Sequence, residues 1–312
     1  MMQKEYRHIP VMLDEVLDNL DIKEDGIYVD CTMGGAGHAS EILKRLTTGW
    51  LYCFEQDDYA YEKGKEKLEK ISNRFTIIPA NFVNLRTELG KLGVYHVDGV
   101  LYDLGVSSFQ FDIPDRGFSY NYDAPLDMRM NTNNKLTAYD IINTYSFSDL
   151  KRIFYVYGEE PYSANIARMI EKERANKPIT TTYELVDVIK KSLPARELRK
   201  KGHPAKQVFQ ALRIAVNDEL DVFEKSLTQA LSLLSSNGRI AVITFHSLED
   251  RICKNIFKEK TEIDIPRGLP IKESEILHEF ELVNKKVIVP TELEIATNHR
   301  SHSAKLRVIK KL

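Results

Sequence analysis

Two acidic residues flank a glycine-rich loop near the start of the chain. Asp30 ends an apolar stretch, the loop Gly34-Gly35-Ala36-Gly37 follows, and Glu55 comes eighteen residues after Gly37. Glycines between a strand and a helix let the backbone approach a ligand, and a helix N-terminus favours a negative group. An acid at the position of Glu55 commonly accepts hydrogen bonds from ribose hydroxyls. The pattern predicts a site for an adenosine-containing ligand, although a tight turn that binds nothing would use similar residues.

The residues around the loop favour one ligand over another. The segment from Gly35 to Ser40 nearly matches the dinucleotide fingerprint, but Ser40 stands at the third glycine position. Asp30 lies four residues before the first glycine, where an acidic side chain can meet the ammonium group of an amino acid. We therefore favour S-adenosylmethionine (SAM) over NAD as the ligand.

A second acidic motif, DLGVSSFQ, covers residues 103–110 and follows another apolar stretch. The carboxyl ends of central strands form the ligand crevice of a doubly wound sheet. A carboxylate at Asp103 can accept a hydrogen bond from an exocyclic amine and leave the nitrogen lone pair aimed at a methyl sulfonium. Catalysis of this kind consists mainly of orienting the reactants. The alternative is that Asp103 only caps a turn.

The spacing of apolar residues predicts the elements that position these groups. Strands expected at 26–30, 50–54, 75–78 and 97–102 alternate with helical stretches, as in a parallel sheet covered by helices on both faces. One long helix or two consecutive helices, stopped by Asn237-Gly238, should precede a fifth strand at 239–245. The last two strands are expected at 287–289 and 306–309.

The middle of the chain has a different pattern. No buried strand is evident between about 113 and 193, whereas apolar residues recur at helical spacing over 148–157 and 164–170. Thr181 and Glu184 match a capping box that begins a further helix. We expect a discontinuous α/β domain, residues 1–112 and 206–312, split by a helical insert of residues 113–205.

Positive charge is concentrated locally in a nearly neutral chain. The 312 residues carry 44 Lys+Arg against 46 Asp+Glu, yet residues 190–213 contain eight basic residues and one acid. Such clusters bind phosphates through counterion release, although a solvated helix face is an equally good interpretation. Lys200, Lys201 and Arg213, with Arg300 near the C-terminus, are the candidate RNA contacts. His246, which follows the fifth strand, is a candidate substrate contact or base, or a structural histidine.

Several classes of protein are disfavoured by what the sequence lacks. The three cysteines show no CxxC spacing, so neither a disulfide framework nor a structural zinc site is expected. The N-terminal residues lack the apolar stretch of a signal peptide, and no window approaches the roughly 20 apolar residues that cross a bilayer. We expect a cytoplasmic protein that holds no metal and contacts no membrane.

The motifs together resemble those of one family, the bacterial cytosine-N4 methyltransferases of small-subunit ribosomal RNA, also called the MraW family. The resemblance covers nearly the whole chain. The matching motifs, in order, are HIPVMLDE (8–15), DCTMGGAGH (30–38), DLGVSSFQ (103–110), RGFS (116–119), PLDMRM (125–130), YGEE (157–160), VFQALRIAVN (208–217), FHSLEDR (245–251) and NHRS (298–301).

The resemblance implies a class I SAM-dependent methyltransferase, with a Rossmann-like, mostly parallel seven-stranded sheet and an inserted helical domain that helps to hold RNA. It implies SAM as methyl donor and N4 of a decoding-region cytosine in 16S rRNA as acceptor. The small ribosomal subunit is thus the expected partner, with a homodimer as one option for the oligomeric state. The family's SAM contacts correspond to Ala36, Gly37, His38, Glu55, Phe82, Asp103 and Gln110, next to Asp30 and Gly35 of the loop.

The chain departs from the family at one of these positions: Glu55 stands where the family usually has Asp. The longer side chain of Glu55 can still reach a ribose diol. The motif DLGVSSFQ at 103–110 also lacks the Pro-Pro-aromatic core of many amino-group methyltransferases. A function of a different class remains as the alternative, namely a non-catalytic ribosome-assembly factor that binds RNA and uses SAM structurally. Loss of methyl transfer but not of RNA binding in Asp103→Ala would distinguish the enzyme from that factor.

Overall fold

The computed structural model of the protein describes residues 9–262 and 278–312, and the chain divides into two compact units. The α/β unit consists of Met1–Gly105 and Leu220–Leu312, and the helical unit consists of Val106–Glu219. His8, the first residue of the first motif, lies outside the described residues. In the described ranges, no helix combines the length and the apolar composition needed to cross a membrane.

The boundaries of the helical unit differ from the predicted insert of 113–205, which is too short at both ends. Helix α11 (Lys206–Asn217), expected in the α/β domain, packs against α7 (Phe147–Gly158). Its apolar side chains, such as Val208 and Leu212, are fully buried in the core of the helical unit. The hydrophobic face of α11 therefore decides to which unit it belongs.

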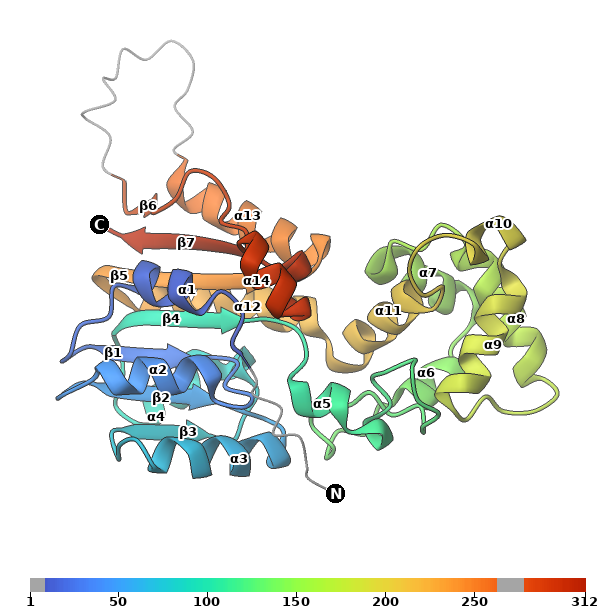
Figure 1. Ribbon diagram of the computed structural model, residues 1–312, viewed down its shortest axis with the longest axis horizontal. Coiled ribbons are helices and arrows are strands. Elements are labelled where there is room, and N and C mark those ends of the chain that lie inside the picture. The colour runs from blue at the N-terminus through green and yellow to red at the C-terminus, as the bar shows by residue number, and fades with distance from the viewer. Residues whose placement is uncertain (1–8, 263–277) are drawn as a thin grey trace, which may run out of the picture. The chain divides into compact units, whose positions relative to one another are not determined.

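A seven-stranded sheet forms the centre of the α/β unit (Figure 1). Its strand order is β3-β2-β1-β4-β5-β7-β6, and β7 pairs antiparallel with both β5 and β6 while the other neighbours are parallel. The order reverses between β1 and β4, which is where doubly wound sheets bind ligands. The strands are β1 (Ile27–Asp30), β2 (Trp50–Phe54), β3 (Phe75–Ile78), β4 (Val97–Asp103), β5 (Leu234–Thr244), β6 (Phe280–Leu282) and β7 (Lys305–Lys311).

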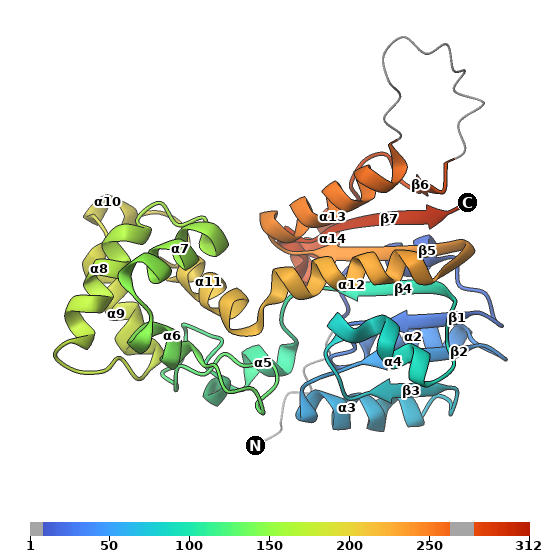
Figure 2. The ribbon, with the colours of Figure 1, turned by 180° about the vertical axis from the view of Figure 1, so that it is seen from behind.

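Helices cover both faces of this sheet, because side chains alternate between the faces along each strand. Leu101 faces a core shared with α1 (Leu13–Leu20), α2 (Gly37–Arg45) and α3 (Asp58–Glu69). Its neighbours Val100 and Tyr102 face the opposite core, which is shared with α4 (Leu85–Lys91), α12 (Glu219–Leu233) and α13 (Ser247–Thr261). Figure 2 shows α4 and α12 on that second face. The expected doubly wound arrangement is confirmed.

Two expectations about the C-terminal third of the chain are wrong, one about the end of a helix and one about a strand. Helix α12 ends at Leu233, so Asn237-Gly238 does not stop it; Asn237 instead adopts φ 66° within the early, irregular part of β5. Residues 287–289 form no strand but only an isolated bridge between Ile288 and Leu306, and the edge strand is β6. The alternative of two consecutive helices is confirmed, because the chain breaks between α11 and α12 at Asp218, with φ 52°.

The helical unit has a core of its own, and no strand is assigned within it. The described capping box of α9, with Thr181 at the N-cap and Glu184 three residues on, confirms that prediction. The helices are α5 (Ser108–Asp112), α6 (Ala138–Thr144), α7, α8 (Ser163–Arg174), α9 (Thr182–Ser192), α10 (Ala195–Leu198) and α11, with the short 3-10 turn η2 (Pro114–Arg116). Three further elements of the α/β unit are η1 (Phe82–Asn84), α14 (Glu292–Thr297) and η4 (His299–Ser303).

Polar side chains form hydrogen bonds that fix the long loop between η2 and α6. Asn217, at the end of α11, donates to the Met128 carbonyl at 2.8 Å and accepts from the Met130 amide at 2.7 Å. Arg129 forms a paired contact with Asp127, whose pKa lies below its usual range because these hydrogen bonds outweigh the effect of burial. The PLDMRM motif is thus held by local contacts within the helical unit.

Candidate active site

Three carboxylates lie at the carboxyl ends of neighbouring strands of the α/β unit. Asp30 ends β1, Asp103 ends β4, and Glu55 directly follows β2. Since these strands are adjacent and parallel, their carboxyl ends share one edge of the sheet. The sequence placed all three acids after strands, and this placement is confirmed. The edge is strongly acidic: Asp30 is buried, and Glu55 and Asp103 are partly buried.

The glycine loop crosses the same edge between β1 and α2. Ala36 is fully buried with φ 52°, a left-handed conformation, and Gly37 opens the helix. A Cβ at Gly37 would lie 2.7 Å from Cγ of Pro10, so only glycine fits there without movement. Helix α2 has no side-chain cap at its N-terminus and no acid in its first turn. Its first amides are therefore suited to a negative group such as an amino-acid carboxylate.

Asp30 and Glu55 accept hydrogen bonds that shape the loop. Asp30 accepts from the Thr32 amide at 3.0 Å, and Glu55 accepts from the amides of Gly34 at 2.9 Å and Asp57 at 2.8 Å. Burial raises the pKa of Asp30 to about 6 and that of Glu55 to about 7, and these hydrogen bonds offset the effect only in part. Each carboxylate oxygen has a second lone pair, so Glu55 keeps acceptor capacity for a ribose hydroxyl.

Asp103 is held beside His38, which comes from the first turn of α2. The Asp103 amide donates to Oγ1 of Thr32 at 2.7 Å, and its Oδ2 lies 3.5 Å from Nδ1 of His38. The side chain as a whole is 23% exposed, yet Oδ1 is buried and has no hydrogen-bond partner among the described residues. Burial, and then the negative charges of Asp30 and Glu249, raise the pKa of Asp103 to about 8. A buried acceptor without a partner is suited to a ligand with a donor or a positive charge.

Phe82 and Gln110 lie in different units. Phe82 begins η1, four residues after the end of β3, is partly buried and packs edge-on against Tyr102, with 5.7 Å between the ring centroids. It therefore stands at the sheet edge where an adenine ring could contact it. Gln110 belongs to the helical unit, where its side chain accepts from the Ser107 amide in the capping box of α5. The structure of the α/β unit alone does not include Gln110, and its SAM contact stays a prediction.

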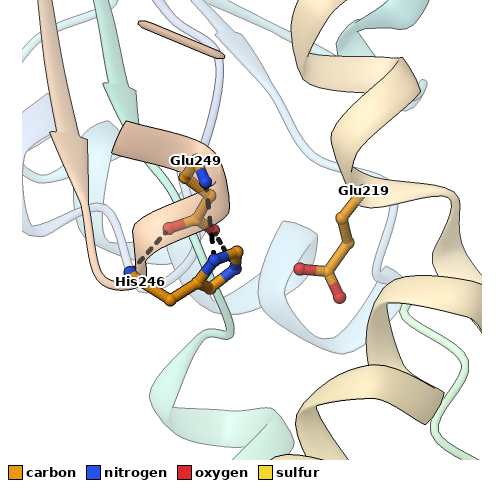
Figure 3. A group of neighbouring side chains, drawn as sticks. All are labelled: Glu219, His246 and Glu249. Carbon is orange, nitrogen blue, oxygen red and sulfur yellow. Dashed lines mark hydrogen bonds and ion pairs between the residues drawn. The ribbon is translucent and has the colours of Figure 1, made fainter. Parts of the chain in front are cut away.

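His246 has a clear local role at the start of α13. Its Nδ1 accepts from the Glu249 amide at 3.5 Å, and Oε2 of Glu249 accepts from the His246 amide at 3.3 Å (Figure 3). The same Glu249 carboxylate approaches Nε2 of His246 at 3.1 Å. These contacts form a capping box, which supports the structural interpretation of His246. An RNA contact by the remaining surface of this residue stays a prediction.

The candidate RNA contacts differ in whether they form ion pairs with acidic residues of the protein. Arg213 forms a paired contact with Glu219 at 2.8 and 2.9 Å, and Lys200 pairs with Glu197 at 2.6 Å. Lys201 is exposed and has no described partner. Arg300, exposed in η4 of the α/β unit, contributes a positive charge that lowers the pKa of Asp103. In the folded chain the excess of positive charge over 190–213 is therefore partly neutralised by Glu219, which lies outside that stretch.

Two residues that the sequence did not single out support Asp103. Thr32 binds both Asp30 and the Asp103 amide, and so joins the ends of β1 and β4. Glu249 is 2% exposed and contributes negative charge to the same edge. The spacing of His246 and Glu249 is that of a capping box, which was the available signal for the second residue. Thr32, two residues before Gly34, offered no comparable signal.

Comparison with known proteins adds a decisive observation. The model of the MraW methylase family matches residues 5–312. The chain belongs to this family. It is thus a methyltransferase of class I fold, and SAM is its methyl donor. The acidic sheet edge fits that ligand, because SAM carries a sulfonium and an ammonium group, while the uncapped N-terminus of α2 suits its carboxylate.

Two relatives of this chain are similar to it over almost their whole length. Proteins named ribosomal RNA small subunit methyltransferase H from Streptococcus mutans serotype c and from Streptococcus dysgalactiae subsp. equisimilis are each 54% identical over 314 residues. In both cases the match covers 100% of this chain and 99% of the relative. A solved rRNA methylase from Streptococcus thermophilus has 12% identity and a TM-score of 0.42, covering 96% of this chain and 93% of that one.

Proposed function

We propose that this MraW methylase transfers the methyl group of SAM to N4 of a cytosine in the decoding region of 16S rRNA. The observation that carries the proposal is Asp103, an acid at the end of a central strand whose buried Oδ1 has no described partner. The names of the two relatives support a substrate in small-subunit rRNA. The motifs that resemble cytosine-N4 methyltransferases support the base and the atom.

Each residue of the acidic edge has a proposed role. Backbone groups of Gly35, Ala36 and Gly37 bind the amino-acid part of SAM together with Asp30, Glu55 binds the ribose, and Phe82 contacts the adenine. Asp103 accepts a hydrogen bond from the target amine and orients its lone pair, which matters because that lone pair is conjugated into the cytosine ring. SAM supplies an electrophilic methyl group. Fixed orientation of two reactants lowers the barrier without a strong base.

The helical unit is proposed to hold the rRNA. Its exposed Lys201 lies in a stretch rich in basic residues, and Lys200 and Arg213 extend that stretch. Phosphate contacts of this kind position the nucleic acid, whereas contacts to the base edge specify it. His246 and Arg300 are the proposed RNA contacts of the α/β unit.

Mass spectrometry of rRNA nucleosides tests the proposal. The protein is incubated with SAM and with small subunits that lack the modification, and the digested nucleosides are analysed. We expect N4-methylcytidine with the parent protein and none with Asp103→Ala. Methylation at another atom or base would show that the substrate is wrongly assigned. Absence of any incorporation in free rRNA, in assembly intermediates and in complete subunits would overturn the proposal.

A further inference from the structure

The contacts of His38 determine which of its ring nitrogens carries a proton. The side chain is 4% exposed, and Nε2 lies 2.9 Å from the Val11 carbonyl oxygen. A carbonyl can only accept a hydrogen bond, so Nε2 carries the hydrogen. In the neutral imidazole, Nδ1 then has a lone pair and no hydrogen. The nearest atom of Asp103, Oδ2, lies 3.5 Å from this Nδ1.

Two acceptors that face each other need a proton between them. With no proton on the pair, the Nδ1 lone pair would oppose an ionised carboxylate that already lies among the negative charges of Asp30 and Glu249. With two protons, hydrogens on both atoms would collide. One proton satisfies both atoms, either as a carboxylic acid that donates to Nδ1 or as an imidazolium that donates to Oδ2.

We infer that His38 and Asp103 together hold one proton in the ligand-free enzyme and release it to solvent when the cationic methyl donor binds. This inference rests on the proposed place of SAM beside Asp103. A nearby positive charge stabilises the ionised carboxylate and therefore takes over the role of the proton. S-adenosylhomocysteine has a neutral thioether in place of the sulfonium, so its binding leaves the proton on the pair. His38 is thus a positioning residue that sets the charge of Asp103.

The consequence is that the charge of the site follows the charge of the ligand. Asp103 is an ionised acceptor while the donor is bound, which is the state that orients an amine. After the methyl group has left, the pair regains its affinity for a proton. Among the described residues, the charges that act on Asp103 are those of Asp30, Glu249 and Arg300, and the first two favour the proton whereas the third disfavours it.

Calorimetry of the full-length protein measures the proton directly. SAM and S-adenosylhomocysteine are titrated at pH 7 in buffers of different ionisation enthalpy, and the slope of the observed enthalpy counts the protons exchanged. We expect the parent to release up to one proton more with SAM than Asp103→Asn does, and no such difference with S-adenosylhomocysteine. The ligand ammonium contributes to both proteins alike, so the comparison isolates the pair.

The His38 side of the pair has its own variant and control. His38→Asn should abolish the extra proton release, because an amide hydrogen at that position stabilises the ionised carboxylate without SAM. His96→Asn, which changes an exposed histidine of the same unit, should release the proton as the parent does. Equal proton release in the parent and in both pair variants would overturn the inference.

A second measurement covers the case in which His38→Asn fails to fold. In the ¹⁵N-histidine spectrum of the parent, Nδ1 of His38 should be hydrogen-bonded without ligand and should shift towards a free lone pair when SAM is added. An unchanged Nδ1 signal would also overturn the inference. If the proton is not released but N4-methylcytidine forms, the proposed function stands without this inference; release without methylation of cytosine would contradict the function alone.

Discussion

The acidic edge of the α/β unit and the basic stretch of the helical unit use charge in opposite ways. Asp30 and Glu249 are each 2% exposed, and both accept hydrogen bonds from backbone amides. The side chains of Lys200 and Arg196 are 68% and 79% exposed. Buried charges are costly to desolvate, whereas exposed ones are screened by salt. Few residues should therefore determine catalysis, and many should share the binding of RNA.

Substitution of Asp103 should have the largest effect on catalysis. We expect Asp103→Asn to lower kcat by about 10²-fold or more, because an amide can no longer carry the negative charge that orients the amine, and the loss of one preorganised electrostatic contact costs about 10²–10³-fold. The KM for rRNA should stay within about threefold, since the contacts to phosphate are unchanged. Steady-state kinetics with purified subunits measure both constants. Asp18→Asn, at an exposed position of α1, is the matched control and should behave as the parent.

The helical unit should be most sensitive at a buried amide rather than at a charge. Asn217→Ala removes the contacts to the Met128 carbonyl and the Met130 amide and leaves both groups without their partner. We expect the free energy of unfolding to fall by about 1–3 kcal/mol. Urea unfolding followed by circular dichroism measures the loss. The exposed Asn176→Ala should change stability by less than about 0.5 kcal/mol, and an equal loss in both variants would contradict the role of Asn217.

The parts of the structure that sequence could predict are those with strong local periodicity. Strands β1 to β4 were placed within one residue, because short apolar runs between turns leave few alternatives. Helix α11 was assigned to the wrong unit, since its hydrophobic face shows that it is buried but not what covers it. The edge strand β6 was missed because Phe280 is its only buried residue.

The candidate site also has features that the sequence predicts and features that appear only in the folded structure. Acids at strand ends are visible in the sequence, and the structure places Asp30 and Asp103 on one edge. The pairing of His38 with Asp103 is not, because it depends on the Val11 carbonyl at one end of the imidazole and on β4 at the other. Likewise, Arg213 is counted as basic along the chain, whereas its contact with Glu219 appears only after folding.

The burial of Asp103 should also be visible as a cost in stability. The folded state raises the pKa of this acid from 3.8 to about 8, so the folded state binds the proton more tightly than the unfolded state. Its contribution is therefore present below about pH 4 and is lost as the pH rises to about 8. Asp103→Asn should be more stable than the parent by at least about 1 kcal/mol at pH 8.5, with a smaller gain at pH 5. Urea unfolding at the two pH values measures the difference in stability. The control Asp18→Asn should show no gain that depends on pH. A gain for Asp103→Asn that is equal at both pH values would contradict the role of burial.

The smallest effects should come from single lysines, and they should be unequal. Lys200 must leave Glu197, 2.6 Å away, before it can bind a phosphate, whereas Lys201 has no described partner to leave. We expect Lys201→Ala to reduce the slope of log affinity for rRNA against log salt by about 0.7–0.9, and Lys200→Ala to reduce it by less than half as much. Filter binding at several salt concentrations gives the slopes. Lys70→Ala, at the end of α3 away from the carboxyl edge of the sheet, should leave the slope unchanged. Equal reductions for Lys200 and Lys201 would show that ion pairing within the helical unit does not set the contribution of each cation.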